Sequence, residues 1–173
     1  MTKNKDEENT KGTLEKIVNN ISFDNLPIKW QNFDFVKFSQ NKTLFDFQKQ
    51  GLKSALKALY LFYVENNGDK KSFFNQYQSN GMGENFDYDL KKKQDSKTVK
   101  FLLEYDKDYP VIDNKLSFEH FINRMSFWMA TGSGKTLIIV KLIELLGYLI
   151  SEKEIPKKDI LFLTHRDVSF RTV

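Results

Sequence analysis

The fold of this chain is decided by the stretch Met129-Ala130-Thr131-Gly132-Ser133-Gly134-Lys135-Thr136. A short apolar run of strand-like length, residues 124–130, leads into it, and the almost continuously apolar residues 137–150 follow it. Another short apolar run, residues 160–164, comes after a charged linker that contains Pro156. This order predicts a strand, a loop, a buried helix and a second strand, which is the pattern of a parallel βαβ crossover. We therefore expect an α/β fold that contains the start of a parallel sheet.

The loop between the predicted strand and helix carries the residue types that bind phosphate. Gly132 and Gly134 let the backbone turn tightly and approach a ligand without a Cβ in the way. Backbone N–H groups at the start of a helix form a site for anions. In such a loop Lys135 can reach the β- and γ-phosphates, and Thr136 can place its hydroxyl on Mg²⁺. The alternative is a Gly/Ser turn with Lys135 on the surface, but the spacing of these residues favours a nucleotide site.

Residues 127–136 resemble motif I of the superfamily 2 helicases and translocases of DEAD/DEAH type, a form of the Walker A P-loop. Met129 stands where the usual loop has its first Gly, and that family often lacks this Gly. The sequence of this motif is most similar to that of the motor subunits of type I and type III restriction systems. The resemblance implies a RecA-like ATPase that uses ATP and Mg²⁺, bound by residues 130–136, to move along duplex DNA. It also implies a methyltransferase or specificity subunit as a partner.

Two further stretches match this family in the expected order. Residues 44–52 resemble the Gln motif, in which a Gln at the head of an amphipathic helix reads adenine, and here that residue is Gln48. Residues 160–167 resemble motif Ia, which contacts the nucleic-acid backbone. Thr164 and Arg166 match this motif, and His165 stands where Pro is usual. An ordinary helix-surface Gln and an ordinary surface Arg remain open as alternatives.

The chain divides by composition into three parts. We expect a disordered tail over residues 1–13 and a mixed, mostly helical region over residues 14–123. That region includes the Gln-motif helix (44–64) and an insertion of mixed short elements (66–119). Residues 124–173 are expected to form the first part of RecA-like ATPase domain 1. No strand ending in Asp-Glu follows the loop, so we expect the N-terminal portion of a longer motor, which is itself inactive and truncated after motif Ia.

Periodicity predicts several local elements in the first half. Residues 14–23 repeat apolar side chains at helical spacing, and residues 45–64 form an amphipathic helix. On that longer helix, Phe47 falls on the apolar face and the polar face carries Lys49, Lys53 and Lys57. Residues 28–38 alternate aromatic and polar groups, which indicates either an extended strand or an irregular aromatic anchor.

Composition limits the function further. The 173 residues include no Cys and two His, which excludes disulfide frameworks, zinc knuckles and thiol nucleophiles. No apolar stretch is long enough for a membrane span and no signal peptide is recognisable, so we expect a cytoplasmic protein. The net charge of +4 is compatible with a nucleic-acid partner.

Two other functions stay open at this stage. One is a P-loop enzyme of another class, such as a small kinase. The other is a non-catalytic remnant that binds nucleotide weakly. An endonuclease site is a weaker possibility, since Asp113-Asn114-Lys115 has the spacing of such a site with Glu104 or Asp106 upstream. Pro110 and Asn114 favour a turn there instead.

Overall fold

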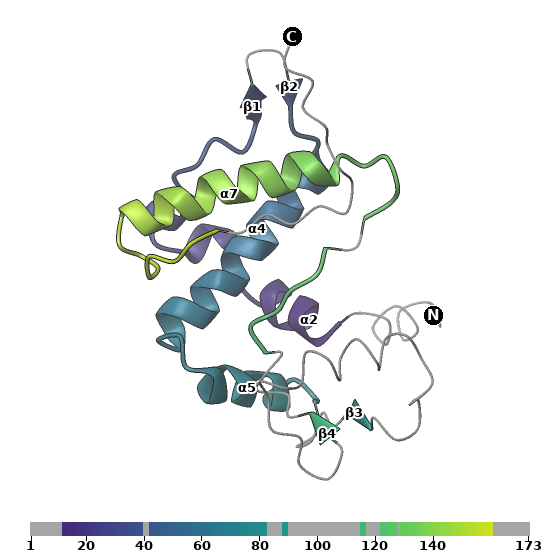
Figure 1. Cartoon of the computed structure of the whole chain (residues 1–173), viewed down its shortest axis with the longest axis vertical. Helices are drawn as coiled ribbons and strands as arrows, with labels where there is room; N and C mark the ends of the chain where they lie inside the picture. The colour runs from purple at the N-terminus through teal and green to yellow at the C-terminus, as the bar shows by residue number, and fades with distance from the viewer. Residues whose placement is uncertain are drawn as a thin grey trace.

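Helices form most of the chain that the structure describes. The computed structural model describes residues 12–39, 42–82, 88–89, 115–116, 122–127 and 129–160 (Figure 1). The helical elements are α2 (Thr13–Asn19), the 3-10 turn η1 (Phe23–Asn25), α3 (Ile28–Gln31), α4 (Asp46–Tyr60), the π-helical turn η2 (Leu61–Glu65), α5 (Lys70–Ser79) and α7 (Lys135–Ser151). The strands are β1 (Lys37–Ser39), β2 (Lys42–Thr43), β3 (Tyr88–Asp89) and β4 (Lys115–Leu116). Within these ranges, no helix is both long enough and apolar enough to cross a bilayer.

The central element is α4, which contacts α2 and α7 and continues into η2 (Figure 1). It confirms the amphipathic helix that periodicity predicts over residues 45–64. Leu52 and Leu56 are fully buried on its core-facing side. Two side chains differ from the predicted faces: Phe47 is 49% exposed, and Lys57 is 5% exposed.

Lys57 is buried because its amine caps the end of a neighbouring helix. Its Nζ donates to the carbonyl oxygen of Val18 at 2.6 Å and to that of Ile21 at 3.2 Å. The last carbonyls of a helix have no N–H donor within the helix, so a cation there is favourable. Burial lowers the pKa of Lys57. The prediction that Lys57 lies on the polar face was therefore wrong, since these acceptors lie at and just beyond the end of α2 and are distant in sequence.

The helix predicted over residues 137–150 is confirmed as α7, which follows the loop. α7 begins at Lys135 and crosses over α4 (Figure 1). Its buried residues, at intervals of three or four, are Ile138, Lys141, Leu145 and Leu149. Val140 is 47% exposed. The helix is thus buried along one face rather than on most sides, because α4 packs against that face.

Residues 28–38 form an aromatic anchor rather than one continuous strand. Trp30 lies in the short helix α3 and is fully buried in a core shared with α4 and α7. Its indole Nε1 donates to Glu154 Oε2 at 3.0 Å, just beyond the end of α7. Lys29 Nζ lies 3.2 Å from Glu154 Oε1. The hydrogen bond from Trp30 and the ammonium of Lys29 together lower the pKa of Glu154.

A second core cluster lies where α2, η2 and α5 meet. Its buried residues are Ile17, Val18, Ala58, Leu61, Phe73, Tyr77 and Ile122. The helix predicted from residue 14 is confirmed as α2, which begins at Thr13. The chain turns between η2 and α5 at Asn67 and Gly68, both of which have a positive φ. Asp69 then caps α5 by accepting the Ser72 N–H at 2.7 Å.

The parallel sheet expected from the sequence is not seen among the described residues. The strands there form two antiparallel pairs, β1 with β2 and β3 with β4. Residues 124–130, Trp128 aside, lie in no strand, and Ile160 lies in none. The rest of the second predicted strand, residues 161–164, is outside the described residues. A strand requires a hydrogen-bonded neighbour, and none of the described segments pairs with residues 124–130.

Candidate phosphate-binding site

The loop before α7 adopts a tight, glycine-dependent conformation. The Ser133 N–H donates to the Ala130 carbonyl at 3.2 Å and closes a turn. Gly132 has a φ of 80° and Gly134 a φ of 77°, in the left-handed region that Gly adopts at no steric cost. Gly134 leads directly into α7. The two glycines at the spacing noted in the sequence are therefore both required by the backbone.

The two side chains predicted to hold phosphate and magnesium lie at the first turn of α7. Lys135 and Thr136 are both exposed. Lys135 Nζ donates to the Ala130 carbonyl at 3.2 Å, so its ammonium folds back over the loop. The first N–H groups of a helix have no intrahelical acceptor, and the helix dipole makes this end positive. The loop and α7 thus present donors and positive charge to solvent at one point.

Gln48 lies against this loop, 85 residues away in sequence. Its Nε2 donates to the Ser133 carbonyl at 2.8 Å. Its Oε1 accepts the Phe45 N–H at 2.9 Å, at the start of α4. The side chain is buried, with an exposed fraction of 1%. The structure therefore brings the candidate Gln and the candidate loop together, and it places both ends of the Gln48 amide in hydrogen bonds within the protein.

Ser133 contributes a second feature to the loop. Its hydroxyl oxygen Oγ is buried and has no hydrogen-bond partner in the protein. A buried hydroxyl without a partner is costly, and a bound group or water that accepts from it would remove that cost. Together with the exposed cation of Lys135, this hydroxyl suits a phosphate-bearing ligand. Among the described residues, no cluster of His, Cys, Asp and Glu is large enough to hold a metal by itself.

Two Phe side chains beside Gln48 are exposed and were not singled out as functional by the sequence. The Phe45 and Phe47 rings stack with centroids 5.8 Å apart and an interplanar angle of 10°. Phe45 is 66% exposed. The only sequence signal for such a pair is two aromatics that flank the acidic first residue of a helix, and this signal is weak.

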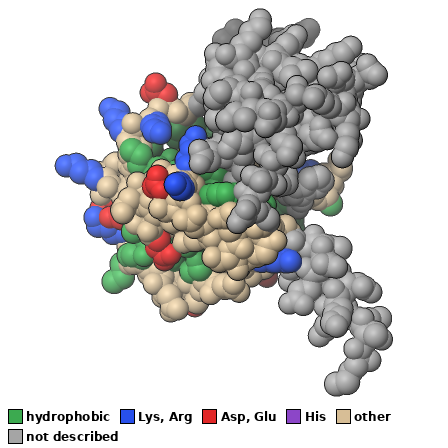
Figure 2. All heavy atoms as spheres, turned by 90° about the horizontal axis from the view of Figure 1, so that it is seen from below, with side chains coloured by type: hydrophobic (Ala, Val, Ile, Leu, Met, Phe, Trp, Pro, Cys, Tyr) green, Lys and Arg blue, Asp and Glu red, His purple; other side chains and the backbone are tan. Residues whose placement is uncertain are grey.

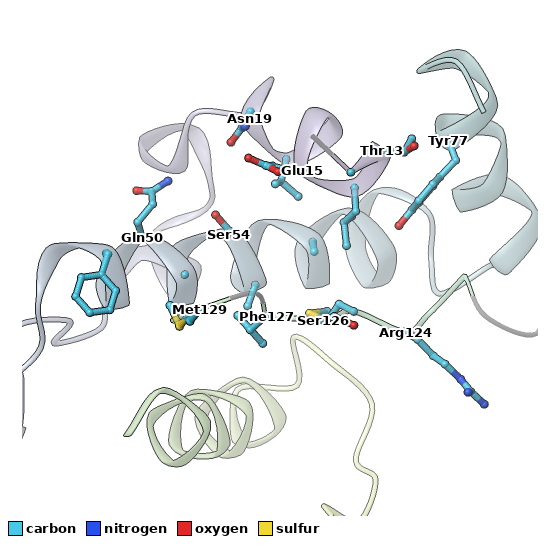
Figure 3. A pocket seen from close by; sticks show the side chains of 18 of the residues that line it. Thr13, Glu15, Asn19, Gln50, Ser54, Tyr77, Arg124, Ser126, Phe127 and Met129 are labelled. Carbon is cyan, nitrogen blue, oxygen red and sulfur yellow. The ribbon is translucent and has the colours of Figure 1, made fainter. Parts of the chain in front are cut away.

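A large open cavity borders the loop. It has a volume of about 1270 Å³ and extends from Ala130 and Ser133 along α4 to Tyr77. Figure 3 shows the segment that carries Arg124, Ser126, Phe127 and Met129 running alongside α4. Neither Lys135 nor Thr136 lines this cavity. The cavity therefore meets the candidate phosphate site at Ala130 and Ser133 but does not reach Lys135 or Thr136.

Two residues near the end of the chain are predicted to contact nucleic acid. Thr164 and Arg166 lie outside the described residues, as do Glu104, Asp106 and Asp113 of the alternative nuclease site. On the face in Figure 2, Lys and Arg side chains are spread singly over the described surface, with acidic and apolar side chains between them. The described part of this face therefore presents no concentrated basic patch.

Comparison with known proteins gives one match. The family model described as "Type III restriction enzyme, res subunit" matches residues 41–168. The matched range covers most of the chain, including Gln48 and the loop. No curated protein and no solved structure matches.

Proposed function

Because this chain belongs to the family of type III restriction enzyme res subunits, we propose that its loop binds ATP with Mg²⁺ for an ATP-dependent DNA motor. The observation that carries the proposal is the loop itself. Two left-handed glycines shape it, a cation lies over it, and a 17-residue helix starts from it. These are the elements that a triphosphate requires in a P-loop.

In the proposed complex the backbone N–H groups of residues 131–136 surround the phosphates, which requires the Ser133 N–H to release the Ala130 carbonyl. Lys135 releases the Ala130 carbonyl and turns to the β- and γ-phosphates as a point charge. Thr136 offers its hydroxyl to Mg²⁺. The nucleotide supplies the bond whose hydrolysis drives movement, and the loop contributes positioning and charge stabilisation. An adenine-reading role for Gln48 would require its amide to release the Ser133 carbonyl or the Phe45 N–H.

Family membership also supports DNA and the other subunits of a restriction–modification complex as partners. We propose Thr164 and Arg166 as contacts to the DNA backbone, since an Arg at the end of a parallel strand is well placed to meet a phosphate. RecA-like architecture for residues 124–173 is part of the same proposal. It requires a partner strand beside residues 124–130.

Nucleotide binding by the full chain tests the proposal. We expect Mg²⁺–ATP to bind, and Lys135→Ala to weaken binding at least tenfold with little change in melting temperature, because Lys135 is exposed. Lys153→Asn is the matched control. It removes one exposed Lys beyond the other end of α7, and Asn tolerates the backbone φ of 60° at that position. Equal binding by the Lys135→Ala variant, or no binding by the unmodified chain, would refute the proposal.

A further inference from the structure

We propose that Gln48 is a positioning residue for the phosphate-binding loop, which it braces through the Ser133 carbonyl, rather than a reader of the nucleotide base. The hydrogen bonds on its amide are the starting observation. Nε2 reaches Ser133 O at 2.8 Å, and Oε1 accepts the Phe45 N–H at 2.9 Å. A side chain that is 1% exposed offers no free amide edge to a base at the surface.

The contact between Gln48 and the loop is close as well as polar. A Cβ added to Gly134 would lie 2.7 Å from Gln48 Nε2, a distance that real Cβ atoms do not show. One turn later on α4, a Cβ added to Gly51 would lie 3.3 Å from Met129 Cε. Glycine at both positions lets α4 and the loop segment approach each other closely. Gln48 thus sits at a point where α4 touches the segment that enters α7.

The brace has a geometric consequence for the loop. In a planar trans peptide the carbonyl and the N–H point in opposite directions. The carbonyl of Ser133 points to Gln48 on α4, so the N–H of Gly134 on the same peptide points away from α4. That N–H belongs to the set of donors in the proposed phosphate site. Gln48 therefore orients a phosphate donor before any ligand arrives, which reduces the ordering cost of binding.

The two roles of Gln48 predict different ligand dependence. A base reader contributes to ATP affinity and to the preference for ATP over GTP. A brace contributes equally to any ligand that carries the phosphates, including inorganic tripolyphosphate, which has no base. This comparison rests on the proposed function, because it needs a chain that binds phosphates. Hydrogen exchange of the loop amides in the ligand-free chain does not rest on it.

The test uses the full chain and three variants. Gln48→Ala removes both hydrogen bonds. Gln48→Glu keeps an acceptor for the Phe45 N–H and loses the donor to Ser133 O. It therefore distinguishes the effect of the hydrogen bond at the start of α4 from the effect of the hydrogen bond to the loop. Gln50→Ala is the matched control, because Gln50 is exposed two residues further along the same helix. Titrations use ATP, GTP and tripolyphosphate, each with Mg²⁺, and exchange is measured without ligand.

We expect Gln48→Ala to weaken all three ligands by the same factor, about two- to twelvefold, the range for one hydrogen bond in a protein interior. We expect Gln48→Glu to speed exchange at Ser133 and Leu137, whose N–H groups donate to the Ala130 and Gly134 carbonyls of the loop, and to leave residues 45–49 unchanged. Gln50→Ala should match the unmodified chain in both measurements. A loss confined to ATP would overturn the brace in favour of base reading. Unchanged exchange at Ser133 and Leu137 in Gln48→Glu, or faster exchange throughout the chain, would also overturn it.

The outcomes also separate this inference from the proposed function. If the unmodified chain binds none of the three ligands, the proposed function fails. The exchange measurement on Gln48→Glu then decides the brace by itself.

Discussion

Replacing Gly134 by Ala should destabilise the chain through two separate effects. The backbone there has a φ of 77°, a conformation that costs an L-residue about 1–2 kcal/mol relative to the right-handed region. The added Cβ would also lie 2.7 Å from Gln48 Nε2. That amide is held at both ends, so it yields only by giving up its bond to Ser133, at about 1 kcal/mol more. The expected loss in the free energy of unfolding is therefore about 2–3 kcal/mol.

Gly132→Ala is the matched control for this prediction. Gly132 has nearly the same φ, 80°, but no atom lies within 4 Å of an added Cβ. Gly132→Ala should therefore lower the free energy of unfolding by the backbone strain alone, about 1–2 kcal/mol. The difference between the two variants measures the contact with Gln48.

Urea unfolding followed by far-ultraviolet circular dichroism provides the two free energies, and a double-mutant cycle completes the assay. In a Gln48→Ala background the contact is already gone, so Gly134→Ala should cost no more than Gly132→Ala. If the two glycine variants lose the same stability in the unmodified background, Gln48 does not touch the loop and the reasoning fails.

Three further predictions concern the supporting structure. Gly51→Ala should stabilise the chain by about 0.5–1 kcal/mol, because Ala is the better helix former. The methyl end of Met129, which an added Cβ would approach, can move aside. A lower melting temperature for this variant would show that Met129 cannot move. The hydrogen bond from Trp30 and the ammonium of Lys29 hold the pKa of Glu154 below its ordinary value. The ionised carboxylate therefore stabilises the folded chain at neutral pH. This contribution is lost as the pH falls through the folded-state pKa. The gap in melting temperature between the unmodified chain and Glu154→Gln should therefore shrink as the pH is lowered, and a constant gap would contradict this. Trp30→Phe should cost about 1–3 kcal/mol in urea unfolding, since it removes buried ring volume and the bond to Glu154; a neutral effect would mean that this anchor is unimportant.

Local sequence patterns predicted the helices well. The periodic residues 45–64 and the apolar residues 137–150 became α4 and α7, because an α-helix forms its hydrogen bonds within its own segment. The turn chemistry around Gly68 likewise depends on a few adjacent residues. The glycine spacing of the loop was readable for the same reason, since a left-handed φ is a property of one residue and its neighbours.

The sequence was less reliable wherever a residue depends on a distant partner. Lys57 was assigned to the polar face by its position on the helix, yet it caps α2. The aromatic run around Trp30 left two structures open, and the acceptor near the end of α7 favoured the anchor. Residues 124–130 have the composition of a strand, but a strand forms only when a neighbour pairs with it.

By itself the sequence predicted a phosphate-binding type of loop, and it determined the helix that follows the loop and the family to which the chain belongs. The reason is that the geometry typical of a phosphate-binding loop depends on a few adjacent residues with fixed backbone requirements. Only the tertiary structure decided how Gln48 is used. Its amide can serve either a base or a backbone carbonyl, and the choice depends on what lies within about 3 Å of it. Ser133 occupies that place, 85 residues along the chain, because α4 packs against the segment that enters α7.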